Sequence, residues 1–221
     1  MSTLLMRLAA PLQAWGLESK FDVRRSGREP TKSGVIGLAA AALGIRRDED
    51  ARLAELAAMR FGVRVDREGA MMRDFHTART SSTAYVTQRY YLSDAVFVAG
   101  LESGDEALLN RIADALTHPV FPLYLGRRSC PPAGPLCMGV VPAALEDALA
   151  AAPLQAAGAP ANGLRMVVEV KPGHKGGFVR DVPVSFNPEK RLYAFRQVNE
   201  TTIGSGRSPA FHDPMAELEG G

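Results

Sequence analysis

The chain has 221 residues, 46% of them hydrophobic, and a formal net charge of +2. This length allows one large core with a small satellite, and so weak a charge excludes the overall basicity of a histone-like nucleic-acid binder. Any nucleic-acid surface must therefore be local. Residues 1–128 contain 18 Lys and Arg against 15 Asp and Glu, whereas the remaining residues contain 8 against 9, so the first part is the better candidate.

The cysteines and the apolar segments bear on cofactor and compartment. Cys130 and Cys137 are the only cysteines, and the companions of a tetrahedral zinc site are missing from their neighbourhood. A reduced cytoplasmic protein without metal or other cofactor is the simplest interpretation. Arg7 interrupts the apolar residues at the amino terminus, and no apolar run is long enough to cross a bilayer. We therefore expect neither export nor a membrane partner.

The first predicted elements are two strands separated by two helices. Residues 3–9 and 60–66 alternate apolar and polar side chains, which indicates half-buried strands. Between them, residues 33–43 form a predicted helix closed by Gly44, and an acid-capped helix runs over residues 48–59. A crossover of this kind predicts helices packed on one face of a sheet.

The start of the first helix carries basic residues where acids are usual. A helix start presents unpaired N–H groups and a partial positive charge, so cations there favour an anionic ligand. We predict a phosphate-binding site here; the alternative is a helix cap beside a solvated basic face. The residues of this predicted site are Thr31, Lys32 and Ser33, with Arg24, Arg25 and Arg28 from the preceding loop.

The next elements complete a known pattern. Residues 90–101 are a predicted third strand, 105–117 a helix and 120–125 a fourth strand. Strand, helices, strand, strand, helix, strand is the ferredoxin-like order of many RNA-binding domains. We predict an α+β fold with a ferredoxin-like, RRM-like domain over residues 1–140.

The last part of the chain is predicted to form a small C-terminal β subdomain over residues 141–221. A short helix over about residues 142–151 and a flexible linker precede three strands, near residues 164–170, 178–184 and 192–198, and a flexible tail follows them.

A segment of about twenty residues joins the second and third strands, at about 71–91. It contains little to bury, so it is either a polar insertion or a protruding hairpin that offers stacking surfaces and cations to single-stranded nucleic acid. The aromatic and basic residues that alternate here are Phe75, Tyr85 and Tyr90 with Arg73, Arg79 and Arg89.

A glycine and two arginines follow the predicted fourth strand. Glycine lets a ligand approach the backbone, and paired guanidinium groups donate forked hydrogen bonds. We predict a second phosphate-binding site in this loop; the alternative is a surface turn with solvated arginines. Its residues are Gly126, Arg127, Arg128, Ser129 and Cys130.

Five segments carry a resemblance to a known family. They are LAAPLQAWG at 8–16, PTKSG at 30–34, RDFHT at 73–77, YLSDA at 91–95 and YLGRRSCP at 124–131. In this order, over about residues 4–140, they resemble the CasD subunits of the type I-E CRISPR surveillance complex, Cascade, members of the RAMP superfamily.

The resemblance implies a non-enzymatic subunit that caps the 5′ handle of the CRISPR RNA. It implies contacts with the large subunit CasA and the first backbone subunit CasC, an indirect role in target-DNA recognition, and a protruding thumb that bears on the RNA. The implied RNA contacts include both predicted phosphate sites, Gln13 and Trp15 in the first motif, Arg73, His76 and Thr77 at the thumb base, and Arg89. Trp15 is equally explained as a core anchor.

Two alternatives stay open. A metal-independent endoribonuclease needs a general acid and base, for which His76 and His118 are the histidines of the first domain. His118 ends a helix, where a cation is favourable without any catalytic role, and Asp74 and His76 have no third metal ligand nearby. The other alternative is a structural subunit whose arginines meet acidic protein surfaces.

Overall fold

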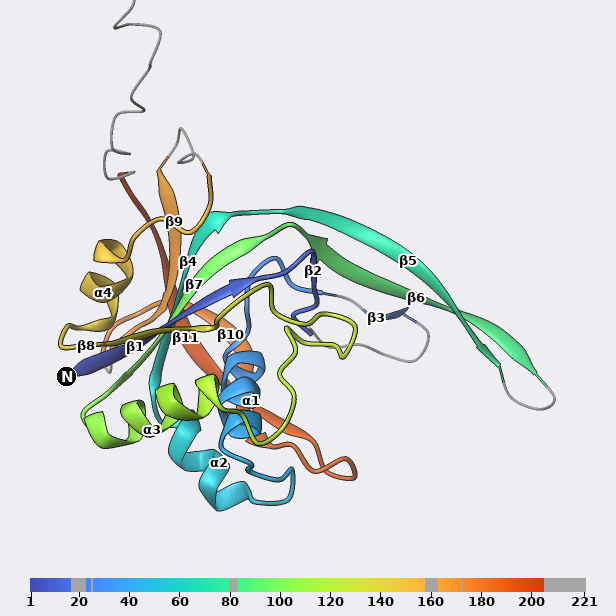
Figure 1. The fold of residues 1–221 in the computed structure, drawn as a ribbon, viewed down its shortest axis with the longest axis horizontal. Helices are drawn as coiled ribbons and strands as arrows, with labels where there is room; N and C mark the ends of the chain where they lie inside the picture. The colour runs from blue at the N-terminus through green and yellow to red at the C-terminus, as the bar shows by residue number, and fades with distance from the viewer. Residues whose placement is uncertain (17–22, 25, 80–82, 158–162, 172, 205–221) are drawn as a thin grey trace, which may run out of the picture.

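The computed structural model describes residues 1–16, 23–24, 26–79, 83–157, 163–171 and 173–204, and shows a mixed α/β fold built mainly from antiparallel sheets (Figure 1). The elements in chain order are β1 (Ser2–Ala9), β2 (Leu12–Gln13), β3 (Val23–Arg24), α1 (Lys32–Ala42), α2 (Asp50–Ala57), β4 (Arg60–Arg67), β5 (Ala70–Arg79), β6 (Ala84–Ser93), β7 (Val96–Ser103), α3 (Glu106–Thr117), β8 (Cys137–Val141), α4 (Leu145–Ala151), β9 (Leu164–Glu169), β10 (Gly177–Ser185) and β11 (Leu192–Ile203). No helix within these residues is long and apolar enough to span a membrane.

The central sheet has seven strands in the order β10-β11-β9-β4-β7-β1-β8, and neighbours pair antiparallel. The predicted strands at 3–9 and 60–66 are confirmed as β1 and β4, with the two predicted helices between them. Gly44 ends α1 with a φ of 72°, as its position after the last apolar residue predicts.

Each face of the central sheet carries its own core, because alternate residues of every strand point to opposite sides. Leu4, Met6 and Leu8 of β1 pack with α1, α2 and α3, whereas Leu5 faces α4 with Met166 of β9. Figure 1 shows the three helices on one side of the sheet and α4 on the other.

The predicted fourth strand at 120–125 is wrong. Pro119 and Pro122 have no N–H to donate to a ladder, and the amides of Val120 and Phe121 donate instead to Ala42 and Ala41, the last carbonyls of α1. The strand that pairs with β1 at this edge is β8, which comes later in the chain.

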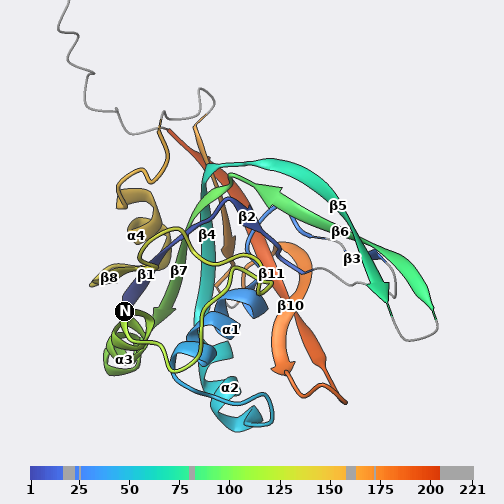
Figure 2. The same ribbon diagram turned by 45° about the vertical axis from the view of Figure 1, so that its right-hand side comes forward.

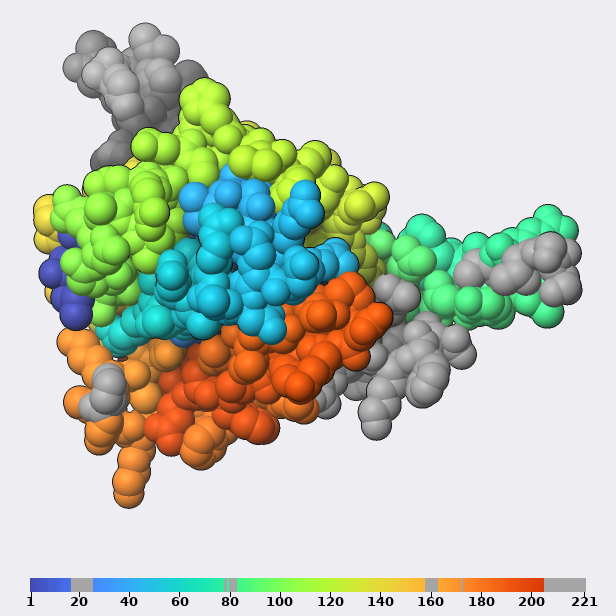
Figure 3. All heavy atoms as spheres, turned by 90° about the horizontal axis from the view of Figure 1, so that it is seen from below, coloured from blue at the N-terminus to red at the C-terminus, as the bar shows by residue number. Residues whose placement is uncertain are grey.

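The predicted third strand is two strands, because Asp94 adopts a left-handed φ of 56° between β6 and β7. Before that break, β5 and β6 pair antiparallel over their full length, and β2 and β3 pair with β6 to complete a second sheet. The β5–β6 hairpin is thus a continuation of the paired strands β4 and β7. It projects from the body, as Figures 1 and 3 show.

The C-terminal strands are predicted correctly, but they do not form a sheet of their own. β9 pairs with β4, so β9, β11 and β10 extend the central sheet. Arg64 ties the preceding helix to the same sheet: its guanidinium pairs with Asp66 and donates to the carbonyls of Leu149 and Ala152 at the end of α4. The described residues after 141 are therefore joined to the first part through the pairing of β9 with β4 and through a shared core.

Candidate nucleic-acid interface

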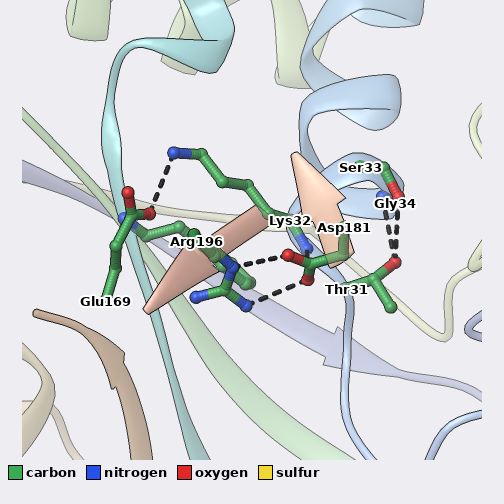
Figure 4. A network of polar contacts seen from close by, with 8 residues as sticks. Thr31, Lys32, Ser33, Gly34, Glu169, Asp181 and Arg196 are labelled. Atoms are coloured by element: carbon green, nitrogen blue, oxygen red, sulfur yellow. Dashed lines mark hydrogen bonds and ion pairs between the residues drawn. The ribbon is translucent and has the colours of Figure 1, made fainter. Parts of the chain in front are cut away.

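The start of α1 is already occupied by an anion from the chain itself (Figure 4). The amide nitrogen of Lys32 donates to Asp181 Oδ2 of β10 at 2.8 Å, and Lys32 Nζ donates to Glu169 Oε2 of β9 at 2.9 Å. Arg196 binds both oxygens of Asp181, at 2.6 and 2.9 Å. A helix start that binds a carboxylate follows the same physics as one that binds a phosphate.

Lys32 is therefore not available to a ligand, which corrects the predicted phosphate site. The residue is only 2% exposed. Burial lowers the pKa of its ammonium group, while the hydrogen bond to Glu169 opposes that shift. Thr31 is the helix cap, with its hydroxyl accepting from the Gly34 amide at 3.2 Å and lying 3.3 Å from the Ser33 hydroxyl. For Thr31, the capping alternative is the one the structure supports.

Gln13 and Trp15 are buried parts of the core. The Gln13 amide donates to the Ala95 carbonyl at 2.7 Å and accepts from the Trp15 indole at 3.0 Å, and both side chains are fully buried. Trp15 packs against Gly34, where an added Cβ would lie 2.9 Å from the indole ring. The core-anchor alternative is confirmed for Trp15, and Gln13 holds the indole in place.

The loop at 126–130 is a tight turn packed against Ala14, which follows β2 and precedes Trp15. Gly126 has a φ of 94°, and a Cβ there would overlap the Ala14 carbonyl, so only glycine fits. The Cys130 amide donates to the Arg127 carbonyl at 2.9 Å. The Cys130 side chain is buried, which raises the pKa of its thiol and leaves it a packing residue.

This turn brings its arginines to the base of the β5–β6 hairpin. The Arg127 guanidinium lies over the Tyr91 ring of β6, 4.5 Å from the ring centroid. Burial alone would raise the pKa of the Tyr91 hydroxyl, but hydrogen bonds with Ser129 and Arg127, and a further one with Arg89, lower it below its ordinary value. We call this group the hairpin-base cluster: Arg89, Tyr91, Arg127, Arg128 and Ser129.

The cluster combines a fixed guanidinium with exposed donors. Arg127 and Arg89 are half-buried, whereas Arg128 and Ser129 are exposed. A guanidinium stacked on an aromatic ring loses little freedom when it binds a phosphate or a base edge. Sequence reasoning missed Tyr91, although its position two residues after Arg89, on the same face of a strand, was a usable signal.

The hairpin has two faces that separate the predicted thumb residues. In the β5–β6 register, Arg73 lies opposite Tyr90 and Thr77 opposite Val86, whereas His76 lies opposite Thr87. Directly opposed residues share a face, so His76 lies on the face of Arg89 and Tyr91, and Arg73 and Thr77 lie on the other. All three predicted residues are exposed, and the Arg73 guanidinium lies 4.8 Å from the centroid of the Phe75 ring.

The basic residues before α1 are only partly described. Arg24 lies in β3, which pairs parallel with β6 so that Arg24 is opposite Arg89, and its backbone therefore lies beside the hairpin-base cluster. Arg28 is exposed. Arg25 lies outside the described residues.

The histidines show contacts of different kinds. His76 Nε2 lies 2.5 Å from Asp74 Oδ2 on the hairpin, and both side chains are partly exposed. His118 is the C-cap residue of α3, where a cation was expected. Among the residues that the structure describes, no group of three or more His, Cys, Asp or Glu is placed to hold a metal ion.

Comparisons with known proteins agree over most of the chain. The family model described as CRISPR-associated protein (Cas_Cas5) matches residues 3–199. The chain is 37% identical over 158 residues to "CRISPR system Cascade subunit CasD" of Escherichia coli (strain K12), which covers 62% of this chain and 70% of that protein.

Two solved structures are similar as well. One, described as "Crystal structure of Cas protein", is 43% identical with a TM-score of 0.75, covering 91% of this chain and 95% of that one. Another, from a "CRISPR RNA-guided surveillance complex", is 34% identical with a TM-score of 0.77, covering 90% of this chain and 89% of that one. Both similarities therefore extend over about nine tenths of the chain.

Proposed function

The chain belongs to the Cas5 family of CRISPR-associated proteins, whose model matches nearly its whole length, and we propose that it is the CasD-type subunit of a Cascade surveillance complex. In this role it binds and caps the 5′ handle of the CRISPR RNA in the cytoplasm, without a cofactor. It anchors the large subunit CasA and the first backbone subunit CasC, so that the guide RNA recognises invading DNA. The similarity to the CasD subunit of Escherichia coli supports this assignment.

The main support for the RNA contact is the hairpin-base cluster. Arg127 and Ser129 of a tight turn interact with Tyr91 of β6, as Arg89 of the same strand does, and the Arg127 guanidinium is held over the tyrosine ring. Guanidinium groups in this setting suit the phosphates and base edges of a bent single strand. Lys32 is not part of this proposal, because its ammonium group is paired with Glu169.

The architecture also fits the proposal. We propose that β4, β7, β1 and β8, in this antiparallel order with the helices between them, are a ferredoxin-like unit. We propose further that the β5–β6 hairpin is the thumb, with Arg73, His76 and Thr77 near the RNA. A similar fold alone does not establish a function. The experiment below therefore changes the arginines of the hairpin-base cluster.

Replacement of Arg127 and Arg128 by Glu tests the RNA contact. We expect the double variant to fold normally but to bind an RNA that carries the 5′ handle much more weakly, in binding titrations over a range of salt concentrations. Removal of one phosphate-binding side chain should flatten the dependence of log K on log salt by roughly 0.7. Arg46→Glu with Arg47→Glu is the matched control, because it reverses two adjacent exposed arginines elsewhere. Equal affinity of both double variants would refute the proposed contact.

A specific observation supports one competing function, an endoribonuclease. Asp74 lies within hydrogen-bonding distance of His76, an arrangement that can orient a general base. We expect the purified protein to leave CRISPR repeat RNA intact with and without magnesium. Specific cleavage that His76→Ala abolishes would support the nuclease instead.

A further inference from the structure

Two phenylalanines stand exposed on the strands at the end of the central sheet. Phe178 of β10 is 72% exposed and Phe195 of β11 is 65% exposed. In the β10–β11 register, Phe195 is opposite Arg180 and Phe178 is opposite Gln197, so the two rings are diagonal neighbours. The Arg180 guanidinium lies 5.9 Å from the centroid of the Phe195 ring. Single exposed apolar residues are common, but neighbouring exposed rings form an apolar patch of the kind that marks interaction sites.

The opposite face of the same two strands is buried, which fixes the outward direction of the rings. Asp181 and Arg196 are the buried neighbours of Arg180 and Phe195, and they pair beneath the start of α1. Phe178 and Phe195 therefore lie on the face that α4 covers elsewhere. Because α4 packs mainly on β4, β7 and β1, no helix among the described residues covers the two rings, which are 72% and 65% exposed.

The charge around the rings indicates a polyanionic partner. Besides Arg196 and Asp181, which pair with each other, residues 171–198 contain five cations and one anion. The cations are Lys171, Lys175, Arg180, Lys190 and Arg191, and the anion is Glu189. Lys171 and Lys175 precede β10, and Lys190 and Arg191 precede β11, so basic residues flank the aromatic pair along the chain at both ends of the hairpin.

We propose that the aromatic face of β10 and β11, formed by Phe178, Arg180 and Phe195, is a second binding site for single-stranded RNA. Exposed rings on a sheet provide stacking surfaces for unpaired bases, and the flanking cations neutralise the backbone. Phe and Arg are also common in protein interfaces, but Lys is depleted there, so the three lysines that flank the rings along the chain favour a polyanion. This inference rests on the proposed function, which brings a single-stranded guide RNA to the chain.

The two hairpins lie on the same side of the body. The β5–β6 and β10–β11 hairpins both extend from the side of the body away from the N-terminus, in both orientations of the ribbon (Figures 1 and 2). A single strand that follows both hairpins would pass along this side of the body.

Binding of the full-length protein to fluorescent oligouridine and oligothymidine of about ten nucleotides tests this inference. We expect Phe178→Ala with Phe195→Ala to weaken binding of oligouridine about tenfold for each ring removed. Phe178→Tyr with Phe195→Tyr keeps the rings and should bind as the unmodified protein does. Val184→Ala is the control for a smaller exposed apolar surface on the same strand, since Val184 is 47% exposed, and should change nothing.

The outcomes separate this inference from the proposed function. Unchanged oligouridine affinity in the double alanine variant overturns the second site, while the Arg127 and Arg128 variant still reports on the first. Absence of any RNA binding by the unmodified protein overturns both. If the alanine variant binds oligouridine normally but no longer joins the other Cascade subunits, the face is a protein interface and the inference is wrong. Tighter binding of oligothymidine than of oligouridine would likewise reject RNA as the occupant.

Discussion

The start of α1 and the hairpin-base cluster have the same apparent signal in the sequence and opposite environments in the fold. Both place cations beside a backbone turn. At α1, Lys32 is buried against Glu169 and the helix start binds Asp181. At the hairpin base, Arg128 is exposed and Arg127 lies over a tyrosine ring. The difference teaches that a basic motif indicates a ligand site only where no acidic side chain of the same chain pairs with it.

The largest expected effect is on stability, from Lys32→Glu. The new carboxylate would lie buried beside Glu169 and Asp181, and disruption of a buried ion pair costs about 3–5 kcal/mol. We expect the urea midpoint to fall accordingly, followed by the fluorescence of Trp15, the only tryptophan and fully buried. Arg47→Glu, at an exposed cation, should have almost no effect.

This prediction can refute the contrast between the start of α1 and the hairpin-base cluster. A Lys32→Glu protein that unfolds at the original urea concentration, and yet loses RNA binding, would return Lys32 to the RNA-binding site.

A smaller effect is expected on RNA affinity, from Tyr91→Leu. The change removes the ring beneath Arg127 and the hydroxyl near Ser129, and a cation–π contact contributes about 1 kcal/mol. We expect RNA affinity to fall about fivefold. Stability should fall as well, because Tyr91 is only 2% exposed and packs in the main core, so a urea curve must show that the variant is folded under the conditions of the binding assay. Tyr91→Phe keeps the ring and should lose less affinity. If the Leu and Phe variants bind RNA equally, the ring does not position the guanidinium.

The smallest effect concerns the ion pair of Arg60 and Glu146, which is less buried than Lys32 and less exposed than Arg128. Arg60 binds Glu146, whose side chain is 40% exposed, and this hydrogen bond lowers the pKa of Glu146 below its unfolded value of 4.5. A lowered carboxyl pKa adds stability above pH 4.5, which is lost as pH falls through the folded-state pKa.

Glu146→Gln should therefore flatten the fall in stability on acidification from pH 7 to 3. Because the Glu146 side chain is 40% exposed, the difference should stay below about 1 kcal/mol. Urea midpoints measured across this range would show it. Parallel acid profiles of the two proteins would mean that the pair adds nothing.

Local patterns predicted most of the strands and helices because their causes are local. Alternating apolar residues specify β1 and β4, and Gly44 specifies the end of α1. The strand at 120–125 failed because the amides of Val120 and Phe121 bond to α1. The prediction of a separate C-terminal subdomain failed because the pairing of β9 with β4 joins segments about a hundred residues apart.

Of the candidate site, only the tight basic turn at 126–130 could be predicted from the sequence. Gly126 and the two arginines after it could be recognised as a tight basic turn. In the fold, this turn lies at the hairpin base, with Arg127 over the Tyr91 ring. The fate of Lys32 could not be read from its neighbours, because Glu169 and Asp181 are 137 and 149 positions away. Trp15 was ambiguous until its contact with Gly34 was seen.

Photocrosslinking of guide RNA to the assembled complex, mapped to peptides, tests the proposed RNA site most directly. We predict crosslinks from the 5′ handle to the β6 segment with Arg89 and Tyr91 and to the turn at 126–130, and none to the peptide that begins α1. Crosslinks concentrated on Thr31, Lys32 and Ser33, with the turn at 126–130 unlabelled, would contradict the assignment.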